Sequence, residues 1–482
     1  MHTLTSPSLF RQSCYVNGQW VDAANNIDVT NPANGERLGS VPNLSVEQVE
    51  ASIVQAHTAM PAWAARTAKE RAQILRRWFD LIEANIDDLG RIMTLEQGKP
   101  LHEAKGEIRY AASFIEWFAE EGKRVYGETI PQTVSSNRLT TIKQPVGVCS
   151  AITPWNFPAA MITRKAAPAL AAGCSIIIKP ASETPFTALA LAELADQAGI
   201  PAGVFNIVTG ASRVLGEQLT QHPLISKFSF TGSTPVGRTL YEQCAPTIKK
   251  TSLELGGNAP FIVFEDADID KAVASGIMAK YRNGGQTCVC VNRFYVHNAV
   301  YDEFLEKFTA AVAKLKVGNG LEADTDIGPM ITGRAIEGMQ MLLDDALAKG
   351  AKLVTLGNEI EEQGQYFNPK VLTEVDHSMD ITNEEIFGPI ATLIRFDSEE
   401  EVLHHANNSI YGLAAYFFSN DVRRVYRVAE KLESGMVGIN TGIISNEVAP
   451  FGGVKQSGLG KEGSRYGIED YLKVKYLCVD IA

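Results

Sequence analysis

Short apolar runs alternate with longer amphipathic stretches through the middle of the chain. Between residues 146 and 257, runs rich in β-branched residues are each followed by a segment with apolar side chains at helical spacing. The alternation predicts strands at Val146–Ile152, Ser175–Lys179, Val204–Val208 and Lys227–Thr231, with helices that end near Gly173 and cover Phe186–Ala198 and Arg213–Gln221. Such a pattern predicts a parallel sheet, and ligands bind parallel sheets at the carboxyl ends of their strands.

A second alternation of the same kind begins after Gly257. It predicts the strands Phe261–Phe264, Arg293–Val296 and Val437–Asn440 and the helices Tyr301–Leu315 and Ser398–Asn407. The predicted fold class is therefore α/β with two parallel-sheet units. A cleft between the two units is the expected place for a ligand.

The pattern before residue 125 predicts a strand at Tyr15–Trp20 followed by amphipathic helices. The helical patterns cover Val46–Ala65, Thr67–Asn85 and His102–Glu120. Thr67 and Glu70 have the spacing of a capping box, which predicts a helix start there.

Two stretches far apart in sequence alternate polar and apolar residues. One is Leu139–Ile142, within 133–145, and the other is Tyr471–Leu477. The pattern predicts solvent-facing strands that form a protruding ribbon and join subunits. The predicted organisation is a nucleotide-binding domain from 1–125 and 146–256, a catalytic domain from 257–455, and an oligomerisation ribbon from 126–145 and 466–482.

Composition narrows the class of protein. The chain has 482 residues, 45% of them hydrophobic and 21% charged, as in an ordinary globular protein of two or three structural units. A net charge of -12 argues against nucleic acid as the main partner. Its seven cysteines form no CxxC pair, so the sequence predicts neither a disulfide framework nor a metal site, and a reducing cytoplasm is expected.

No targeting or membrane segment is expected. Residues Met1–Gln19 lack a basic flank followed by an apolar core, so they do not resemble a secretory signal. The longest uncharged stretch, Gln144–Thr163, is interrupted by prolines and does not read as a membrane span.

The segment Asn283–Cys290 places a thiol in a Gly-rich polar turn without a run of apolar neighbours. Cys288 is therefore a candidate nucleophile, although a single cysteine is also often a buried and inert residue. Glu254 ends a strand-like run beside Gly256 and Gly257, where it is either a general base or a solvated carboxylate. Asn156 offers an amide donor at the carboxyl end of a predicted strand.

Two glycine-containing stretches are candidates for phosphate binding. In Phe230-Thr231-Gly232-Ser233 a strand ends in a turn, and Pro235 opens a helix, so free N–H groups there suit an anion or an ordinary helix cap. The stretch Gly458–Gly463 matches G-x-G-x-x-G but follows no strand, so we interpret it as a flexible loop.

Taken together, these motifs resemble the aldehyde dehydrogenase superfamily, most closely the succinate-semialdehyde dehydrogenases. The matching segments occur in family order over nearly the whole chain: Pro154–Pro158, Lys179–Ser182, Phe230–Ser233, Glu254–Gly257, Gly285–Cys288 and Glu384–Pro389. The resemblance implies two Rossmann-like parallel-sheet domains, a protruding β oligomerisation ribbon, and a homotetramer built as a dimer of dimers.

The resemblance also implies a mechanism. Cys288 adds to an aldehyde carbonyl, and the Asn156 amide and the backbone N–H of Cys288 hold the oxyanion. Hydride then passes to a nicotinamide, and water activated by Glu254 hydrolyses the thioester to release a carboxylate.

The cofactor contacts implied by the resemblance involve Trp155, Lys179, Ser182, Gly232, Ser233, Leu255, Glu385 and Phe387. Lys179 matches a contact to the adenosine ribose, Ser233 to the pyrophosphate and Glu385 to the nicotinamide ribose, while Phe387 lies near the nicotinamide. Relatives that prefer NAD tend to carry Glu at the position of Ser182, where it repels a 2′-phosphate. We therefore expect NADP to be preferred and NAD to be used as well, with Glu183 directed elsewhere by strand alternation.

Arg164, Arg282 and Ser445 match positions that bind the distal carboxylate in succinate-semialdehyde dehydrogenases. The alternative is that both arginines lie on helix surfaces. Cys290 matches a redox partner of the nucleophile in some relatives, or it is a packed thiol without a role. The rival functions are a glutarate-semialdehyde dehydrogenase, an aldehyde dehydrogenase of broader specificity, and a catalytically silent relative.

Overall fold

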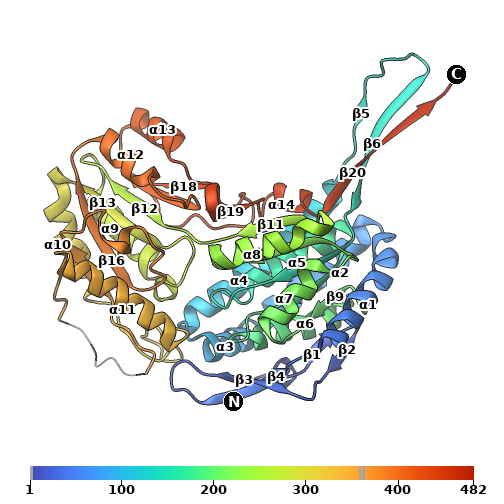
Figure 1. The fold of residues 1–482 in the computed structure, drawn as a ribbon, viewed down its shortest axis with the longest axis horizontal. Coiled ribbons are helices and arrows are strands. Elements are labelled where there is room, and N and C mark those ends of the chain that lie inside the picture. The colour runs from blue at the N-terminus through green and yellow to red at the C-terminus, as the bar shows by residue number, and fades with distance from the viewer. Residues whose placement is uncertain (1–3, 358–359, 361–363) are drawn as a thin grey trace.

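The computed structural model describes residues 4–357, 360 and 364–482. Residues 1–3, at the start of the stretch considered as a secretion signal, lie outside the described residues, as do 358–359 and 361–363 of the predicted catalytic domain. Within the described part of the chain, the strands form sheets of eight, seven, three and two strands (Figure 1).

The eight-stranded sheet contains the four strands predicted between residues 146 and 257 and the opening at residues 15–20. Its parallel core runs in the order β11-β10-β7-β8-β9, and β1 and β2 extend it antiparallel. Between residues 146 and 257, the predicted strand Ser175–Lys179 is confirmed to the residue as β8, and the limits of the other three predicted strands are correct within two residues. The strands are β1 Cys14–Val16, β2 Gln19–Val21, β7 Val148–Ile152, β8 Ser175–Lys179, β9 Phe205–Ile207, β10 Ile225–Thr231, β11 Lys250–Glu254 and β19 Gly458–Leu459.

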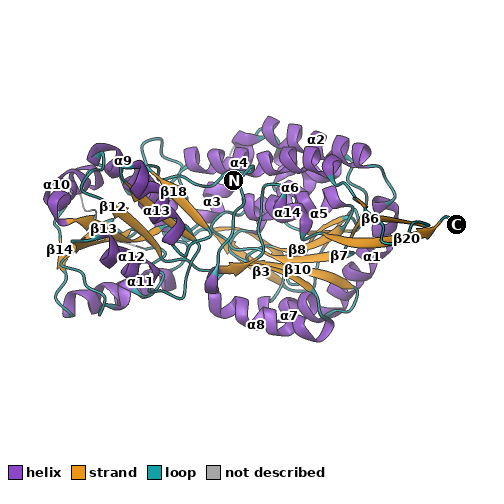
Figure 2. Ribbon diagram, turned by 90° about the horizontal axis from the view of Figure 1, so that it is seen from above, coloured by secondary structure: helices purple, strands orange, loops and turns teal. Residues whose placement is uncertain are grey.

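Helices cover both faces of this sheet (Figure 2). Helices α7 and α8 lie on one face, and α5 and α6 lie on the other, where α2, α3 and α4 form a further layer. Large buried side chains such as Trp78, Phe114 and Phe118 fill the space between these layers. The helices are α1 Val46–Ala64, α2 Ala68–Ala84, α3 Ile86–Gln97, α4 Leu101–Glu121, α5 Ala160–Ala172, α6 Pro185–Ala198, α7 Ser212–Gln221 and α8 Thr234–Cys244.

The N-terminal region confirms one local prediction and corrects two. Thr67 and Glu70 form the predicted capping box at the start of α2. The opening at residues 15–20 is a hairpin rather than one strand, because Asn17 and Gly18 both take positive φ and turn the chain between β1 and β2. Helix α3 was not predicted, because Asn85 separates it from α2 by a single residue.

The seven-stranded sheet follows the order β14-β15-β16-β13-β12-β17-β18, and its neighbours from β15 to β18 pair in parallel. The second predicted α/β unit is therefore present. Its strands are β12 Ala259–Val263, β13 Val291–His297, β14 Lys352–Leu353, β15 Lys370–Thr373, β16 Ile390–Phe396, β17 Ala414–Phe418 and β18 Met436–Ile439. Its helices are α9 Ile269–Tyr281, α10 Tyr301–Val312, α11 Gly333–Ala348, α12 Glu399–Asn407 and α13 Val422–Lys431.

A three-stranded ribbon projects from the body of the molecule (Figure 1). It pairs β20 (Leu472–Asp480) antiparallel with β6 (Asn137–Pro145), and β6 with β5 (Thr129–Ile130). The two alternating stretches thus lie side by side, although more than 300 residues separate them in sequence. A separate hairpin joins β3 (Asn26–Thr30) to β4 (Arg37–Pro42), and the short helix α14 (Tyr466–Glu469) precedes β20.

The interpretation of Gly458–Gly463 as a flexible loop is wrong at its first residues. Gly458 and Leu459 form β19, which pairs antiparallel with the end of β11, so that Gly458 lies opposite Glu254. A side chain at residue 458 would meet the carbonyl oxygen of Leu253, and this close approach requires glycine. The segment therefore closes the edge of the sheet beside Glu254.

All seven cysteines lie within the described residues and are free thiols. Among the described residues, no cluster of His, Cys, Asp and Glu side chains is arranged to hold a metal ion. In the same part of the chain, no helix has the length and apolar character needed to cross a bilayer.

Candidate active site

Two cavities meet at Cys288. One has a volume of about 220 Å³ and is lined by Lys99, Glu103, Gly106, Glu107, Tyr110, Phe157, Met161, Arg164, Arg282, Thr287, Cys288, Val289, Ser445 and Phe451. The other has a volume of about 310 Å³ and is lined by Pro154, Trp155, Asn156, Phe157, Met161, Thr231, Gly232, Ser233, Glu254, Leu255, Gly256, Cys288, Glu385 and Phe387. We call them the arginine cavity and the sheet-edge cavity. Their common wall is Phe157, Met161 and Cys288.

The loop that carries Cys288 is built from residues in left-handed conformation. Asn283, Gly284 and Gly285 have φ values of 52°, 62° and 76°. A side chain at residue 285 would lie 2.3 Å from the carbonyl oxygen of Gly388, so glycine is required there. The Gly-rich turn predicted from the sequence therefore brings the backbone close to its surroundings and directs Cys288 toward the cavities.

A hydrogen-bond network ties this loop to Asn156. The Nδ2 atom of Asn156 donates to the carbonyl of Gln286 at 3.1 Å. The carbonyl of Asn156 accepts from Lys99 Nζ at 2.7 Å and from Asn283 Nδ2 at 3.1 Å. On the other side, Glu103 of α4 accepts the backbone N–H of Asn283 at 2.9 Å. The candidate oxyanion donor and the candidate nucleophile are thus held by one set of contacts.

The Cys288 thiol is half-buried, and burial raises its pKa to about 12. The positive charges of Arg164 and Arg282 act in the opposite direction, while Glu385 and Glu254 raise the pKa further. The sulfur therefore carries its proton at neutral pH. Its attack on a carbonyl requires a base or a change in its surroundings.

Glu254 lies at the end of β11, and its side chain is buried. Its Oε2 atom has no hydrogen-bond partner among the described residues. Burial raises the pKa of Glu254 well above its usual range, and the negative charge of Glu462 raises it further, against the opposing charges of Arg164 and Lys165. A carboxyl with a raised pKa and a free oxygen that faces a cavity is suited to general-base catalysis.

Glu462 is the buried carboxylate that pairs with the positive charges of this region, and it was not predicted from the sequence. Its Oε1 atom lies 2.7 Å from Lys165 Nζ, and its Oε2 atom lies 2.8 Å from Arg164 Nε. Lys165 also donates to Thr231 Oγ1 at 2.6 Å. Nearly 300 residues separate the partners along the chain, so no local pattern indicates the pairing.

The sheet-edge cavity lies at the carboxyl ends of β7, β10 and β11 and suits a nucleotide. Ser233 begins α8 without capping it through its side chain, so the first N–H groups of the helix are available to an anion. Glu385 accepts the N–H of Gly257 at 3.0 Å, and burial raises its pKa to about 7. The rings of Trp155 and Phe387 meet edge to face with centroids 5.5 Å apart.

The cavity brings together most of the residues expected to bind a cofactor, but Lys179 and Ser182 do not line it. Ser182 and Glu183 lie in the turn between β8 and α6, and both line a separate hollow of about 270 Å³. The expectation that strand alternation directs Glu183 away from Ser182 is therefore wrong. Lys179 is buried at the end of β8, which lowers its pKa to about 8, and its Nζ atom lies 3.2 Å from the Pro180 carbonyl oxygen.

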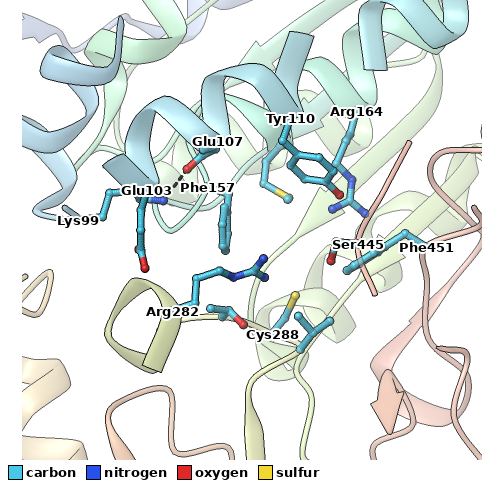
Figure 3. A pocket seen from close by; sticks show the side chains of 14 residues that line it. Lys99, Glu103, Glu107, Tyr110, Phe157, Arg164, Arg282, Cys288, Ser445 and Phe451 are labelled. Carbon is cyan, nitrogen blue, oxygen red and sulfur yellow. Dashed lines mark hydrogen bonds and ion pairs between the residues drawn. The ribbon is translucent and has the colours of Figure 1, made fainter. Parts of the chain in front are cut away.

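The arginine cavity contains Arg164, Arg282, Ser445 and Cys288 together (Figure 3). Arg164 is 2% exposed, so its interpretation as a helix-surface residue is wrong. The Arg282 guanidinium lies 5.4 Å from the centroid of the Phe157 ring and is paired with no carboxylate within the described part of the chain. Two buried or half-buried guanidinium groups beside a thiol form a site for an aldehyde that also carries an anion.

One wall of this cavity was not identified from the sequence. Glu103, Gly106, Glu107 and Tyr110 all come from α4, at positions i, i+3, i+4 and i+7 of one helix face. This spacing was visible in the sequence, but a polar helix face usually faces solvent. Here Glu107 is buried and binds Lys99, and it also accepts the N–H groups of Ala159 and Ala160 at 2.9 and 3.2 Å.

Cys290 is buried. Its thiol donates to the carbonyl of Lys280 at 3.4 Å, and burial raises its pKa. It lines neither cavity. These contacts fit a packed thiol, and a role as redox partner of Cys288 stays a prediction.

Comparison with known proteins agrees with this geometry. The Aldehyde dehydrogenase family matches residues 20–477. The chain is 61% identical over 480 residues to the NADP(+) succinate-semialdehyde dehydrogenase GabD of Escherichia coli, covering 99% of this chain and 100% of that protein. It is also 61% identical to the glutarate-semialdehyde dehydrogenase of Pseudomonas putida, with the same coverage. A crystal structure of an aldehyde dehydrogenase from Brucella melitensis superposes with a TM-score of 0.99 at 61% identity, covering 100% of both chains.

The chain therefore belongs to the aldehyde dehydrogenase family. Its two parallel-sheet units and projecting ribbon form the fold that the resemblance implied.

Proposed function

We propose that this protein oxidises succinate semialdehyde to succinate and that NADP is its preferred hydride acceptor. The observation that carries the proposal is the position of Cys288 between two cavities, one lined by Arg164, Arg282 and Ser445 and the other suited to a nucleotide. A semialdehyde fits this arrangement because its carbonyl can meet the thiol while its distal carboxylate meets the guanidinium groups. The names of the relatives from E. coli and P. putida support the same class of substrate.

The chemistry begins at Cys288, whose thiol loses its proton to solvent as the sulfur adds to the aldehyde carbonyl. The Asn156 Nδ2 atom and the backbone N–H of Cys288 then stabilise the oxyanion, and a donor of this kind contributes roughly 3–4 kcal/mol. A nicotinamide held in the sheet-edge cavity would supply the hydride acceptor, and loss of hydride would convert the thiohemiacetal on Cys288 to a thioester. Phe157 and Met161, which separate the two cavities, restrict the approach of the substrate to the side of the thiol.

Glu254 then completes the reaction as general base. It takes a proton from water, the water attacks the thioester carbonyl, and the acid leaves while the Cys288 thiol is regenerated. The raised pKa of Glu254 gives the carboxylate the basicity that this step needs. Its free Oε2 atom is available to hold the water.

The preference for NADP rests on Ser182. A serine in the turn after β8 does not repel a 2′-phosphate and can donate a hydrogen bond to it. Lys179 precedes this turn as the last residue of β8 and would contact the ribose. The neighbouring residue, Glu183, is exposed and negatively charged. Its charge weakens the preference for a 2′-phosphate, so we expect NAD to be used as a second cofactor.

We further propose that the protein is a cytoplasmic homotetramer built as a dimer of dimers. The outer strand of the ribbon, β20, exposes Val474, Tyr476 and Val479, with exposed fractions of 65%, 57% and 53%. Apolar side chains on a projecting strand are suited to pairing with another subunit. The free cysteines are consistent with a reducing compartment.

A panel of aldehydes tests the proposed substrate. The kcat/KM values of three- to six-carbon semialdehydes and of uncharged aldehydes of equal length should be measured with NADP and with NAD. We expect succinate semialdehyde with NADP to be the best pair. Glutarate semialdehyde is the second candidate, because one methylene changes binding by only about 1–3 kcal/mol. Equal kcat/KM values for carboxylated and uncharged aldehydes would indicate an aldehyde dehydrogenase of broad specificity.

Trapping the enzyme with substrate tests the nucleophile. Mass spectrometry should show an acyl adduct on Cys288, and Cys288→Ala should abolish NADPH formation. A catalytically silent relative would show neither an adduct nor turnover.

A further inference from the structure

The hydroxyl group of Tyr110 is a buried polar atom without a partner. Tyr110 lies on α4 and lines the arginine cavity, where its Oη atom is shielded from solvent and has no hydrogen-bond partner among the described residues. Its ring is held edge to face against Phe114, with centroids 5.0 Å apart. An unpaired buried hydroxyl is unfavourable and therefore needs an explanation.

Arg164 presents a second unpaired donor in the same cavity. Its Nη2 atom has no hydrogen-bond partner within the described part of the chain, although Nε lies 2.8 Å from Glu462. Phe451, whose ring centroid is 3.9 Å from the guanidinium carbon, packs against the group. Figure 3 shows the Tyr110 hydroxyl directed toward this guanidinium group.

The cavity's own acidic groups already have partners. Glu107 binds Lys99 and two N–H groups of the chain, and Glu103 accepts the N–H of Asn283. Burial raises the pKa of Tyr110 more than the charges of Arg164 and Arg282 lower it, so the hydroxyl keeps its proton and acts as a donor. A carboxylate has about four acceptor sites and would satisfy both unpaired donors at once.

We propose that the Tyr110 hydroxyl donates a hydrogen bond to the distal carboxylate of the substrate beside Arg164, which makes Tyr110 a determinant of specificity for carboxylated aldehydes. This inference rests on the proposed oxidation of succinate semialdehyde. The Tyr110 hydroxyl is then a neutral hydrogen-bond donor that acts beside the charged groups of Arg164 and Arg282. Tyr110 then contacts the distal carboxylate of the substrate, and Cys288 contacts the reacting carbon.

The test is Tyr110→Phe, which removes one oxygen atom and keeps the ring. We expect kcat/KM for succinate semialdehyde to fall between about 10-fold and 100-fold, mainly through KM, because a hydrogen bond to a charged group is lost. Turnover of butanal, which has no distal carboxylate, should fall far less. The inhibition constant of succinate should rise by the same factor as KM, which reports the contact without turnover.

Tyr281→Phe is the matched control. Tyr281 also has a buried hydroxyl without a partner among the described residues, but it lines neither cavity. The kcat/KM values for succinate semialdehyde and for butanal should therefore be unchanged in this variant.

The possible outcomes separate the inference from the proposed function. The inference would be overturned if Tyr110→Phe lowered kcat/KM equally for succinate semialdehyde and butanal. It would also be overturned if kcat/KM fell for neither substrate. If the wild-type enzyme itself did not prefer succinate semialdehyde to butanal, the proposed function would fail instead.

Discussion

Exchange of Glu254 for glutamine should separate the two halves of the reaction. The amide has the shape of the carboxyl group but cannot accept a proton from water. Glu254 and Cys288 line the same cavity, while the arginine cavity is formed without Glu254. Formation of the thioester should therefore continue, and its hydrolysis should slow.

The expected size of the effect follows from the role and from the surroundings of the side chain. A positioned general base accelerates its step by about 10²- to 10⁴-fold, so the steady-state turnover rate should fall by a factor in that range. Stability should change little near neutral pH. Burial disfavours the charged form of this carboxyl and raises its pKa, so a neutral amide of the same shape should be tolerated at this position.

Rapid mixing of the variant with NADP and succinate semialdehyde provides the assay. Absorbance of NADPH should show a burst stoichiometric with subunits, followed by a slow steady rate. In the wild type, hydrolysis should slow as pH falls, because Glu254 takes up a proton below its raised pKa and can no longer act as a base. In Glu254→Gln this pH dependence should disappear from the steady state.

Glu385→Gln is the matched control, because Glu385 lines the same cavity and its pKa is raised to about 7. It should raise the KM for NADP without separating the burst from the steady rate. The reasoning would be refuted if Glu254→Gln showed no burst and slow thioester formation, since Glu254 would then take its proton from Cys288.

Three further substitutions test other parts of the site. Arg282→Met should lower kcat/KM for succinate semialdehyde by about 10- to 100-fold and leave butanal unchanged, because a charged contact is lost; equal losses would exclude a carboxylate pocket. Ser182→Glu should raise the KM for NADP about tenfold or more and spare NAD, since it places a negative charge against the 2′-phosphate; an unchanged KM would contradict that reasoning. Lys99→Met should lower the free energy of unfolding by about 3–5 kcal/mol in urea, because it leaves the buried Glu107 carboxylate unpaired, and adding Glu107→Leu should recover part of the loss.

The sequence predicted the elements whose patterns are local. Strand β8 is five buried residues between a helix and a proline, and its limits were predicted to the residue. The catalytic loop was found because three features coincide in a short segment, namely Asn283, two glycines and a thiol. The edge strand β19 was missed because its two residues have a partner, β11, that lies about 200 residues away in sequence.

The walls of the site were less predictable, for a physical reason. Helical periodicity shows that Glu103, Glu107 and Tyr110 share one face of α4, but it does not show whether that face meets water or a cavity. The same limit applies to Arg164, which periodicity alone could not distinguish from a surface arginine. Burial and unpaired donors, visible only in three dimensions, distinguish the two cases.

The buried pair of Lys99 and Glu107 links these walls to the reacting groups. Lys99 donates to the carbonyl of Asn156, and Glu107 binds the first N–H groups of α5, the helix that carries Met161 and Arg164. A buried ion pair is seldom more stabilising than well-packed apolar side chains, so stability alone does not account for it. It fixes the oxyanion donor, the wall between the cavities and one arginine relative to a single helix, α4. We infer that the pair contributes to catalysis through position, because a displacement of about 1 Å in such a site can cost 100-fold in rate.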